Sequence, residues 1–134
     1  MGGLLIQSGF EPDKRSCWLL EGFLFCLPGE TLRRIRGRVS GLAGAGSRLG
    51  FDIINGDVLT SPNTRPWIEM QAAAGAPWIG TLDDPAGFLA GLGWRATLSQ
   101  IGQPDANYDR WTGPVIPVTA PGLPHNWYVT ARRA

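Results

Sequence analysis

The chain has 134 residues and is nearly neutral, with 12 Lys and Arg against 11 Asp and Glu. This length predicts one domain over residues 1–134. The balance of charge argues against a partner held mainly by electrostatics, such as a nucleic acid or an anionic membrane surface. Hydrophobic residues make up 43% of the chain, enough for a packed core, while charged residues make up 17% against about 25% in ordinary soluble domains. The low fraction of charged residues predicts that part of the protein surface is apolar and is covered by another segment or molecule.

The sequence predicts a soluble, cytoplasmic protein with no metal site. The first residues lack the positively charged start of a secretory signal. The longest apolar run, residues 17–28, is interrupted by Glu21 and is shorter than the roughly 20 residues that span a bilayer. If this run is an extended strand, Cys17 and Cys26 point to opposite faces and cannot form a disulfide. We expect two reduced thiols packed in the core. No Cys/His cluster resembles a zinc site.

The first third of the chain predicts a strand, a helix and a second strand. Residues 16–28 begin as a continuous apolar run, which is typical of a strand buried on both faces and predicts a sheet with helices on each side. Residues 30–43 have apolar side chains at spacings of three and four and four arginines between them, which predicts an amphipathic helix with a solvated arginine face. Residues 47–54 read as the next strand. Together they predict a βαβ unit.

The middle of the chain has weaker signals. Residues 67–74 are compatible with a short helix, and residues 75–80 with a loop. Asp83, Asp84 and Pro85 then predict a helix start, because an Asp side chain can cap free N–H groups and Pro is tolerated in the first turn. We expect this helix to stop at Gly93.

The last third predicts two more strands separated by a long loop. Residues 94–101 alternate moderately between apolar and polar side chains, and residues 126–131 form the final strand. Residues 102–122 contain four prolines, which favours an ordered loop. With the βαβ unit before them, these strands predict an α/β fold.

Glu21 is the most informative single residue. It is an acid in an apolar segment, near the point where the predicted strand gives way to a loop. Ligands of open α/β sheets bind just beyond the carboxyl ends of the strands, where a carboxylate can accept hydrogen bonds from ribose hydroxyls or an α-ammonium group. An internal ion pair with an arginine is the competing explanation, because a buried carboxylate needs a partner.

Other candidate site residues lie in the second strand and in the long loop. Asp52, late in the strand, either lines a pocket or caps the following turn. The cluster at residues 107–111 holds Tyr108 and Arg110, and the planar guanidinium of Arg suits a carboxylate substrate. A loop held in place by its aromatic residues is the alternative.

Three other features indicate structure rather than chemistry. His125 has no nucleophile motif near it, so we expect no catalytic triad. The glycines of residues 41–47 follow a predicted helix and precede a strand, the reverse of a phosphate-binding loop. The arginines of the helix at residues 30–43 have no basic-aromatic module beside them that would indicate nucleic-acid binding.

Several segments together resemble a known family. They are residues 18–28 (WLLEGFLFCLP), 46–52 (GSRLGFD) and 127–133 (WYVTARR), joined by 9–13, 83–89, 93–94 and 106–111. In this order they resemble bacterial members of the leucine carboxyl methyltransferase-like family, which are S-adenosylmethionine-dependent O-methyltransferases. The chain departs from the family at Cys26, where Tyr is usual, and at Asp109, where Gly is usual. The second departure predicts a different loop backbone.

The resemblance implies a Rossmann-like class I methyltransferase fold in which Glu21 helps to hold S-adenosylmethionine. The family's Gly-rich cofactor loop and its ribose-binding acid belong to an N-terminal half that has no counterpart before residue 16. The chain therefore looks like the C-terminal half of the doubly wound sheet. A sheet cut beside the strand at residues 17–25 would also expose backbone groups and apolar side chains.

Two functional hypotheses follow. In the first, the protein transfers a methyl group to a carboxylate or hydroxyl of a small molecule, with Glu21 binding the cofactor and Asp52, Tyr108 and Arg110 orienting the acceptor. In the second, it is a non-catalytic α/β half-domain that self-associates or docks on a partner carrying the missing cofactor-binding half.

Overall fold

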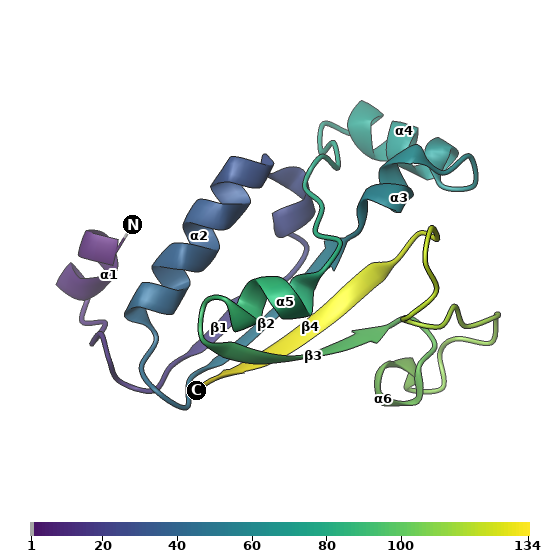
Figure 1. The fold of residues 1–134 in the computed structure, drawn as a ribbon. Coiled ribbons are helices and arrows are strands. Elements are labelled where there is room, and N and C mark those ends of the chain that lie inside the picture. Colours follow the sequence, from purple (N-terminus) through teal and green to yellow (C-terminus); the bar gives the residue numbers. More distant parts are fainter. Residues whose placement is uncertain (1) are drawn as a thin grey trace.

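The computed structural model describes residues 2–134 around a four-stranded mixed sheet (Figure 1). The strands are β1 (Cys17–Leu20), β2 (Arg48–Ile54), β3 (Trp94–Gln100) and β4 (Asn126–Arg133), in the spatial order β1-β2-β4-β3. β1 and β2 pair in parallel, whereas β4 runs antiparallel to both of its neighbours. The final strand of the chain therefore lies inside the sheet, and β1 and β3 form its edges.

The helices include the two that the sequence predicted most clearly. They are α1 (Gly2–Gln7), the 3-10 turn η1 (Leu24–Cys26), α2 (Gly29–Leu42), α3 (Gly56–Thr60), α4 (Arg65–Ala73), α5 (Pro85–Ala90) and α6 (Pro104–Asn107). α2 and α5 confirm the predicted helices, and the Asp84 side chain accepts a hydrogen bond from the Gly87 N–H at 2.8 Å, as expected of a cap. In residues 2–134 no helix has the length and apolar character needed to cross a membrane.

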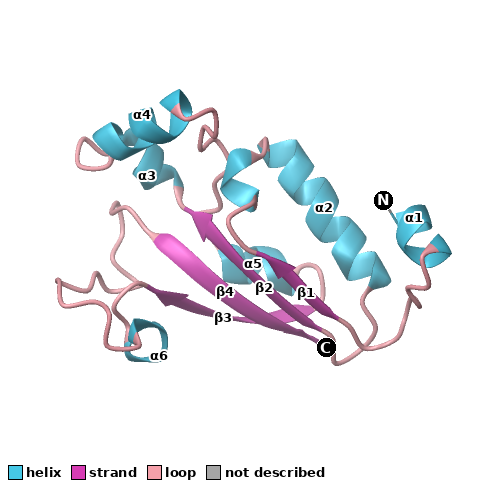
Figure 2. Ribbon diagram, turned by 180° about the vertical axis from the view of Figure 1, so that it is seen from behind, coloured by secondary structure: helices cyan, strands magenta, loops and turns pink. Residues whose placement is uncertain are grey.

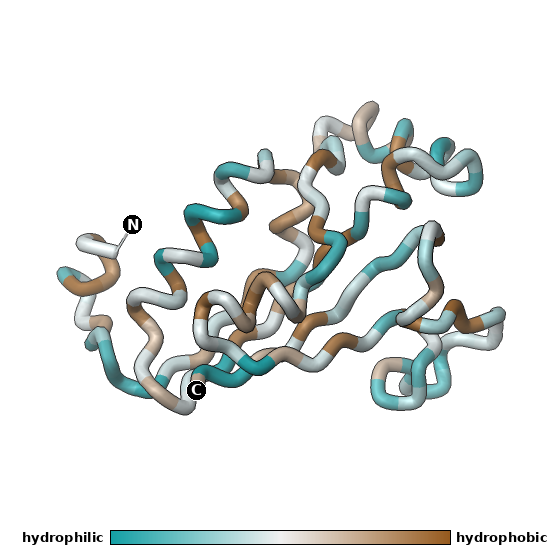
Figure 3. The backbone as a smooth tube through the Cα atoms, in the orientation of Figure 1, coloured by the Kyte–Doolittle hydropathy of each residue, from teal (hydrophilic) through white to brown (hydrophobic). Residues whose placement is uncertain are grey.

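One face of the sheet carries the core, and α2 and α5 pack on that face. Alternate residues of β2 and β4, such as Phe51 and Val129, are buried there. Hydrophobic and hydrophilic residues alternate along α2 (Figure 3), and its buried side joins the sheet through Ser40, whose hydroxyl oxygen accepts a hydrogen bond from Trp94 Nε1 at 2.8 Å. This packing results from period-2 strands meeting a helix with one apolar side.

Arg36 corrects the prediction of a solvated arginine face on α2. Its side chain is buried, its guanidinium carbon lies 3.6 Å from the centre of the Phe88 ring of α5, and its Nε donates to the Leu32 carbonyl. Burial, with a smaller contribution from the Arg33 charge, lowers the pKa of Arg36 from its ordinary value to about 10. The helical spacing could not show that α5 supplies an aromatic ring over this position.

The sequence predicted that residues 16–28 begin with a strand buried on both faces, in a sheet with helices on each side. This prediction is wrong for residues 2–134. β1 has only four residues and lies at the sheet edge, and Leu19 is 70% exposed. The apolar run consists of two elements: β1, and η1, which turns Leu24 and Phe25 into the core. The face of the sheet away from α5 is open (Figure 2), with exposed residues such as Thr130 of β4. Exposed apolar surface beside β1 is therefore confirmed.

The two cysteines are free thiols in different environments. Cys26 is partly buried and packs against the core, as predicted, but Cys17 is exposed. The prediction of a buried Cys17 is wrong because β1 is an edge strand whose outer face has no cover.

Candidate functional site

A groove lies beside the ends of β1 and β3 on the open face of the sheet. Its volume is about 790 Å³. Three of the four predicted site residues line it: Glu21, Tyr108 and Arg110. The other lining residues come from β3, β4 and the loop that follows β3: Thr97, Ser99, Ile101, Gly102, Asp105, Ala106, Asn107, Trp111, Tyr128 and Thr130. The fold thus brings together residues that are more than 100 positions apart in the sequence.

Glu21 follows the last residue of β1, at the carboxyl end of the strand, as the sequence predicted. It is exposed, and in residues 2–134 the ion pair within 4 Å is between Lys14 and Glu11, so Glu21 is not paired with an arginine. The next residue, Gly22, has a φ of +64°, a conformation that glycine adopts without strain. The turn therefore presents a carboxylate with free acceptor oxygens to the groove.

Asp52 does not line this groove but holds the turn that carries Glu21. Its Oδ1 accepts a hydrogen bond from the Gly22 N–H at 2.8 Å. The sequence left open whether Asp52 lines a pocket or caps the turn after β2; in the structure it instead caps the turn after β1. Its role toward substrate stays a prediction, and its observed contact is that of a positioning residue.

Tyr128 is a site residue that the sequence reading missed. It lies opposite Asp52 in the β2–β4 register and lines the groove. Burial, and to a lesser extent the Asp52 carboxylate, raises the pKa of Tyr128. The sequence signal that could have identified Tyr128 is the alternation of side chains along β4, which places Tyr128 on the opposite face of the sheet from Trp127.

We expect Asp52→Asn to lower the pKa of Tyr128 without returning it to the ordinary value, because burial remains. The chain has two tyrosines, so a Tyr108→Phe background leaves a single phenol whose ionisation can be followed by ultraviolet absorbance. Asp57→Asn, which removes a carboxylate elsewhere in the chain, is the control. An unchanged Tyr128 titration in the Asp52 variant, with the fold intact, would contradict this electrostatic coupling.

The loop after β3 carries the other predicted residues in an unusual backbone. Tyr108 and Asp109 have φ values of +48° and +56°, in the left-handed region. Asp109 thus adopts a conformation that glycine favours, and Asp tolerates it better than most residues. Asn107 Oδ1 accepts a hydrogen bond from the Trp111 backbone N–H at 2.8 Å, which holds the backbone of the loop in place at Trp111. The other aromatic residue of the loop, Tyr108, is 80% exposed.

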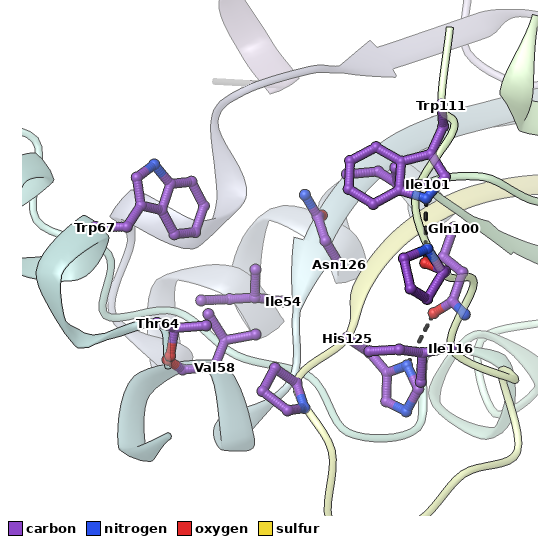
Figure 4. A pocket seen from close by; sticks show the side chains of 12 residues that line it. Ile54, Val58, Thr64, Trp67, Gln100, Ile101, Trp111, Ile116, His125 and Asn126 are labelled. Atoms are coloured by element: carbon purple, nitrogen blue, oxygen red, sulfur yellow. Dashed lines mark hydrogen bonds between the residues drawn. The ribbon is translucent and has the colours of Figure 1, made fainter. Parts of the chain in front are cut away.

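A second pocket, of about 340 Å³, adjoins the groove (Figure 4). It lies where β2 and β3 end and β4 begins, and it shares Ile101 and Trp111 with the groove. Its lining residues are Ile54, Val58, Thr64, Trp67, Gln100, Ile101, Trp111, Pro114, Ile116, Pro124, His125 and Asn126. This pocket could not be predicted from the sequence, because its walls come from four separate segments.

His125 has a structural set of partners inside this second pocket. Its Nδ1 lies 2.8 Å from Gln100 Oε1, its Nε2 lies 2.9 Å from the Ala120 carbonyl oxygen, and its ring stacks on Trp127. These contacts hold the His125 ring between an amide, a backbone carbonyl and an indole. Residues 2–134 also contain no group of three or more His, Cys, Asp or Glu side chains that could hold a metal ion.

Comparison with known proteins relates the chain to methyltransferases. No known protein-family profile matches it. A Frankia alni protein named as an S-adenosyl-L-methionine-dependent methyltransferase is 33% identical over 115 residues, which are 81% of this chain and 37% of that protein. A Streptomyces avermitilis protein of the same name is 32% identical, over 81% of this chain and 38% of its own length. The chain thus spans little more than a third of these relatives.

Solved structures show the fold. A DUF574 family protein from Streptomyces avermitilis superposes with a TM-score of 0.65 at 14% identity, over 96% of this chain and 48% of its own. A structure described as an O-methyltransferase from Nostoc punctiforme has a TM-score of 0.54 at 14% identity, over 92% of this chain and 32% of its own. The predicted Rossmann-like α/β fold is therefore confirmed.

Proposed function

We propose that this chain is the C-terminal part of an S-adenosylmethionine-dependent O-methyltransferase of the leucine carboxyl methyltransferase-like type. The observation that carries the proposal is the placement of Glu21 at the carboxyl end of β1, with no ion-pair partner among residues 2–134, in one groove with Tyr108 and Arg110. The similarity to relatives named as methyltransferases supports it.

The residues present fit one part of the cofactor. S-adenosylmethionine supplies a methyl group on a positively charged sulfur, and its ribose hydroxyls and α-ammonium group are hydrogen-bond donors. Glu21 has free oxygens that can accept from these donors, and its negative charge complements the cation. The Asp52 contact to Gly22 fixes the backbone that presents this carboxylate.

The loop after β3 would orient a small-molecule acceptor. Arg110 can bind a carboxylate through two parallel N–H donors, and Tyr108 can donate or accept a hydrogen bond. Transfer to an oxygen depends largely on alignment and exclusion of water, so the groove needs no strongly activated nucleophile. The acceptor is thus expected to carry a carboxylate or hydroxyl.

Calorimetric titration of the folded chain with S-adenosylmethionine tests the proposal. We expect weak, saturable binding, and we expect Glu21→Ala to weaken it by roughly tenfold, the usual effect of losing a hydrogen bond to a charged group. Glu30→Ala is the matched control, because Glu30 is an exposed glutamate in the first turn of α2. Equal affinity of the wild-type chain and the Glu21 variant would contradict the role of Glu21.

Absence of saturable binding would favour the second hypothesis, a half-domain that acts on a partner or on a second copy. The specific observation in its favour is the edge strand β1, which within residues 2–134 pairs with β2 alone and exposes Leu19. Unpaired edge groups and an apolar side chain are a template for another strand. Sedimentation of the chain alone would then show self-association, or a complementing segment would bind.

A further inference from the structure

We propose that the second pocket, between the ends of β2 and β3 and the start of β4, binds a planar, largely apolar small molecule that carries one hydrogen-bonding group. Nothing in the proposed cofactor and acceptor contacts uses this pocket, except that its wall residues Ile101 and Trp111 also line the groove. The inference rests on its apolar walls and on an unsatisfied amide inside it.

The walls are large apolar side chains that the fold leaves partly open to solvent. Trp67 is 36% exposed, Ile116 37%, Ile101 40% and Trp111 43%. They belong to α4, to the end of β3 and to the long loop, and Figure 4 shows the indoles of Trp67 and Trp111 on opposite sides of the pocket. Burying such surface is favourable, and two indole rings suit a flat aromatic body. The volume is within the range of small-molecule sites.

Gln100 provides the polar contact. Its side chain is 5% exposed, and its Nε2 has no hydrogen-bond partner in residues 2–134. The Ala120 carbonyl can only accept, so His125 Nε2 must donate to it, and His125 Nδ1 engages one end of the Gln100 amide. With Nδ1 at one end of the amide, the other end has no partner in residues 2–134, and a buried unpaired amide group costs about 1–3 kcal/mol. A ligand hydroxyl, which both donates and accepts, can pair with this end of the Gln100 amide.

Asn126 adds a second unpaired atom to the pocket. Its Oδ1 is buried and has no partner in the described part of the chain, and its side chain lies between Trp67 and Trp111 in Figure 4. Two unsatisfied amides in one apolar pocket are unusual, because buried polar groups in folded proteins are nearly always bonded. They define where the polar group of the ligand sits. That this ligand is the methyl acceptor, or its aromatic part, rests on the proposed function.

The test compares two probes of the same shape, 1-naphthol and 1-methylnaphthalene, added to the chain without S-adenosylmethionine. Binding is followed by NMR, with the indole N–H signals of Trp67 and Trp111 as local reporters. We expect 1-naphthol to bind saturably and to shift both signals, and 1-methylnaphthalene to bind roughly tenfold more weakly, because it leaves the amides unpaired. Gln100→Leu should remove most of this difference.

Two isoleucine variants make the test specific. Ile116→Asp places a carboxylate at the wall and should reduce 1-naphthol affinity by at least about tenfold, the effect of an unpaired charge in an apolar site. Ile79→Asp changes an isoleucine that is 50% exposed and does not line the pocket, so affinity should be unchanged. Equal loss in both variants, equal affinity for the two probes, or no saturable binding by the folded chain would overturn the inference. None of these outcomes depends on cofactor binding, which the titration with S-adenosylmethionine measures separately.

Discussion

Trp94→Ala should lower the free energy of unfolding by about 3–5 kcal/mol, the usual cost of truncating a buried Trp. Trp94 begins β3, is 2% exposed and donates from Nε1 to Ser40 of α2. It therefore joins the edge strand β3 to the helix that covers the sheet. The substitution leaves a cavity and an unpartnered hydroxyl between them. Urea denaturation followed by circular dichroism measures the loss.

Trp94→Phe and Trp111→Ala separate the contributions to this effect. Trp94→Phe keeps most of the apolar volume and removes the hydrogen bond, so we expect a loss of about 1–2 kcal/mol. Trp111→Ala truncates a Trp that is 43% exposed and should cost less than Trp94→Ala. If the two alanine variants proved equally stable, the placement of Trp94 in the core would be wrong.

Gly80→Ala should destabilise the protein by about 3 kcal/mol, at the upper end of the usual overpacking cost. A Cβ at Gly80 would lie 2.5 Å from the carbonyl oxygen of Leu27 and 2.6 Å from that of Leu24, both backbone atoms that cannot rotate away. The Gly80 N–H also donates to the Phe25 carbonyl at 2.8 Å. The added methyl would therefore push the segment that follows α4 off η1. A thermal unfolding curve would record this as a lower midpoint.

Gly37→Ala is the matched control and should have the opposite sign. Gly37 lies in the interior of α2, is exposed, and a Cβ there would have no heavy atom within 4 Å. Alanine restricts the unfolded chain and favours the helix, so we expect a gain of about 0.5–1 kcal/mol. The same Gly-to-Ala substitution thus tests a close steric contact at Gly80 and helix propensity at Gly37. A loss of stability in both variants would argue against the close approach of Gly80 to η1.

Local periodicity was sufficient for the elements whose packing repeats along the sequence. α2 was predicted from apolar spacings of three and four, and β3 from its alternation, and both are confirmed within two residues. The start of α5 was predicted from the capping chemistry of Asp84, which needs only neighbouring residues. These signals are local, so they do not depend on the rest of the fold.

Signals that depend on distant neighbours were misread or missed. A continuous apolar run has the same composition whether it forms one buried strand or an edge strand followed by a turn into the core, so β1 and η1 were merged. Arg36 is buried because Phe88, more than 50 residues later, covers it. Glu21, Tyr108 and Arg110 were each singled out from local chemistry, but nothing in the sequence showed that they line one groove. Gln100 was missed because its proposed role depends on a buried Nε2 atom without a hydrogen-bond partner in residues 2–134, which no sequence pattern shows.

The position of β4 constrains the order in which the chain can fold during synthesis. β2 and β3 do not pair with each other, because β4 separates them, and β4 comprises residues 126–133. A ribosome therefore has to deliver these last residues before the two earlier strands can share a sheet. Until then β2 can pair only with β1 and β3 has no neighbouring strand, and every contact that closes the sheet spans a large sequence separation. Forming such long-range contacts is slow compared with helix formation, so α2 and α5 can form before β4 pairs with β2 and β3.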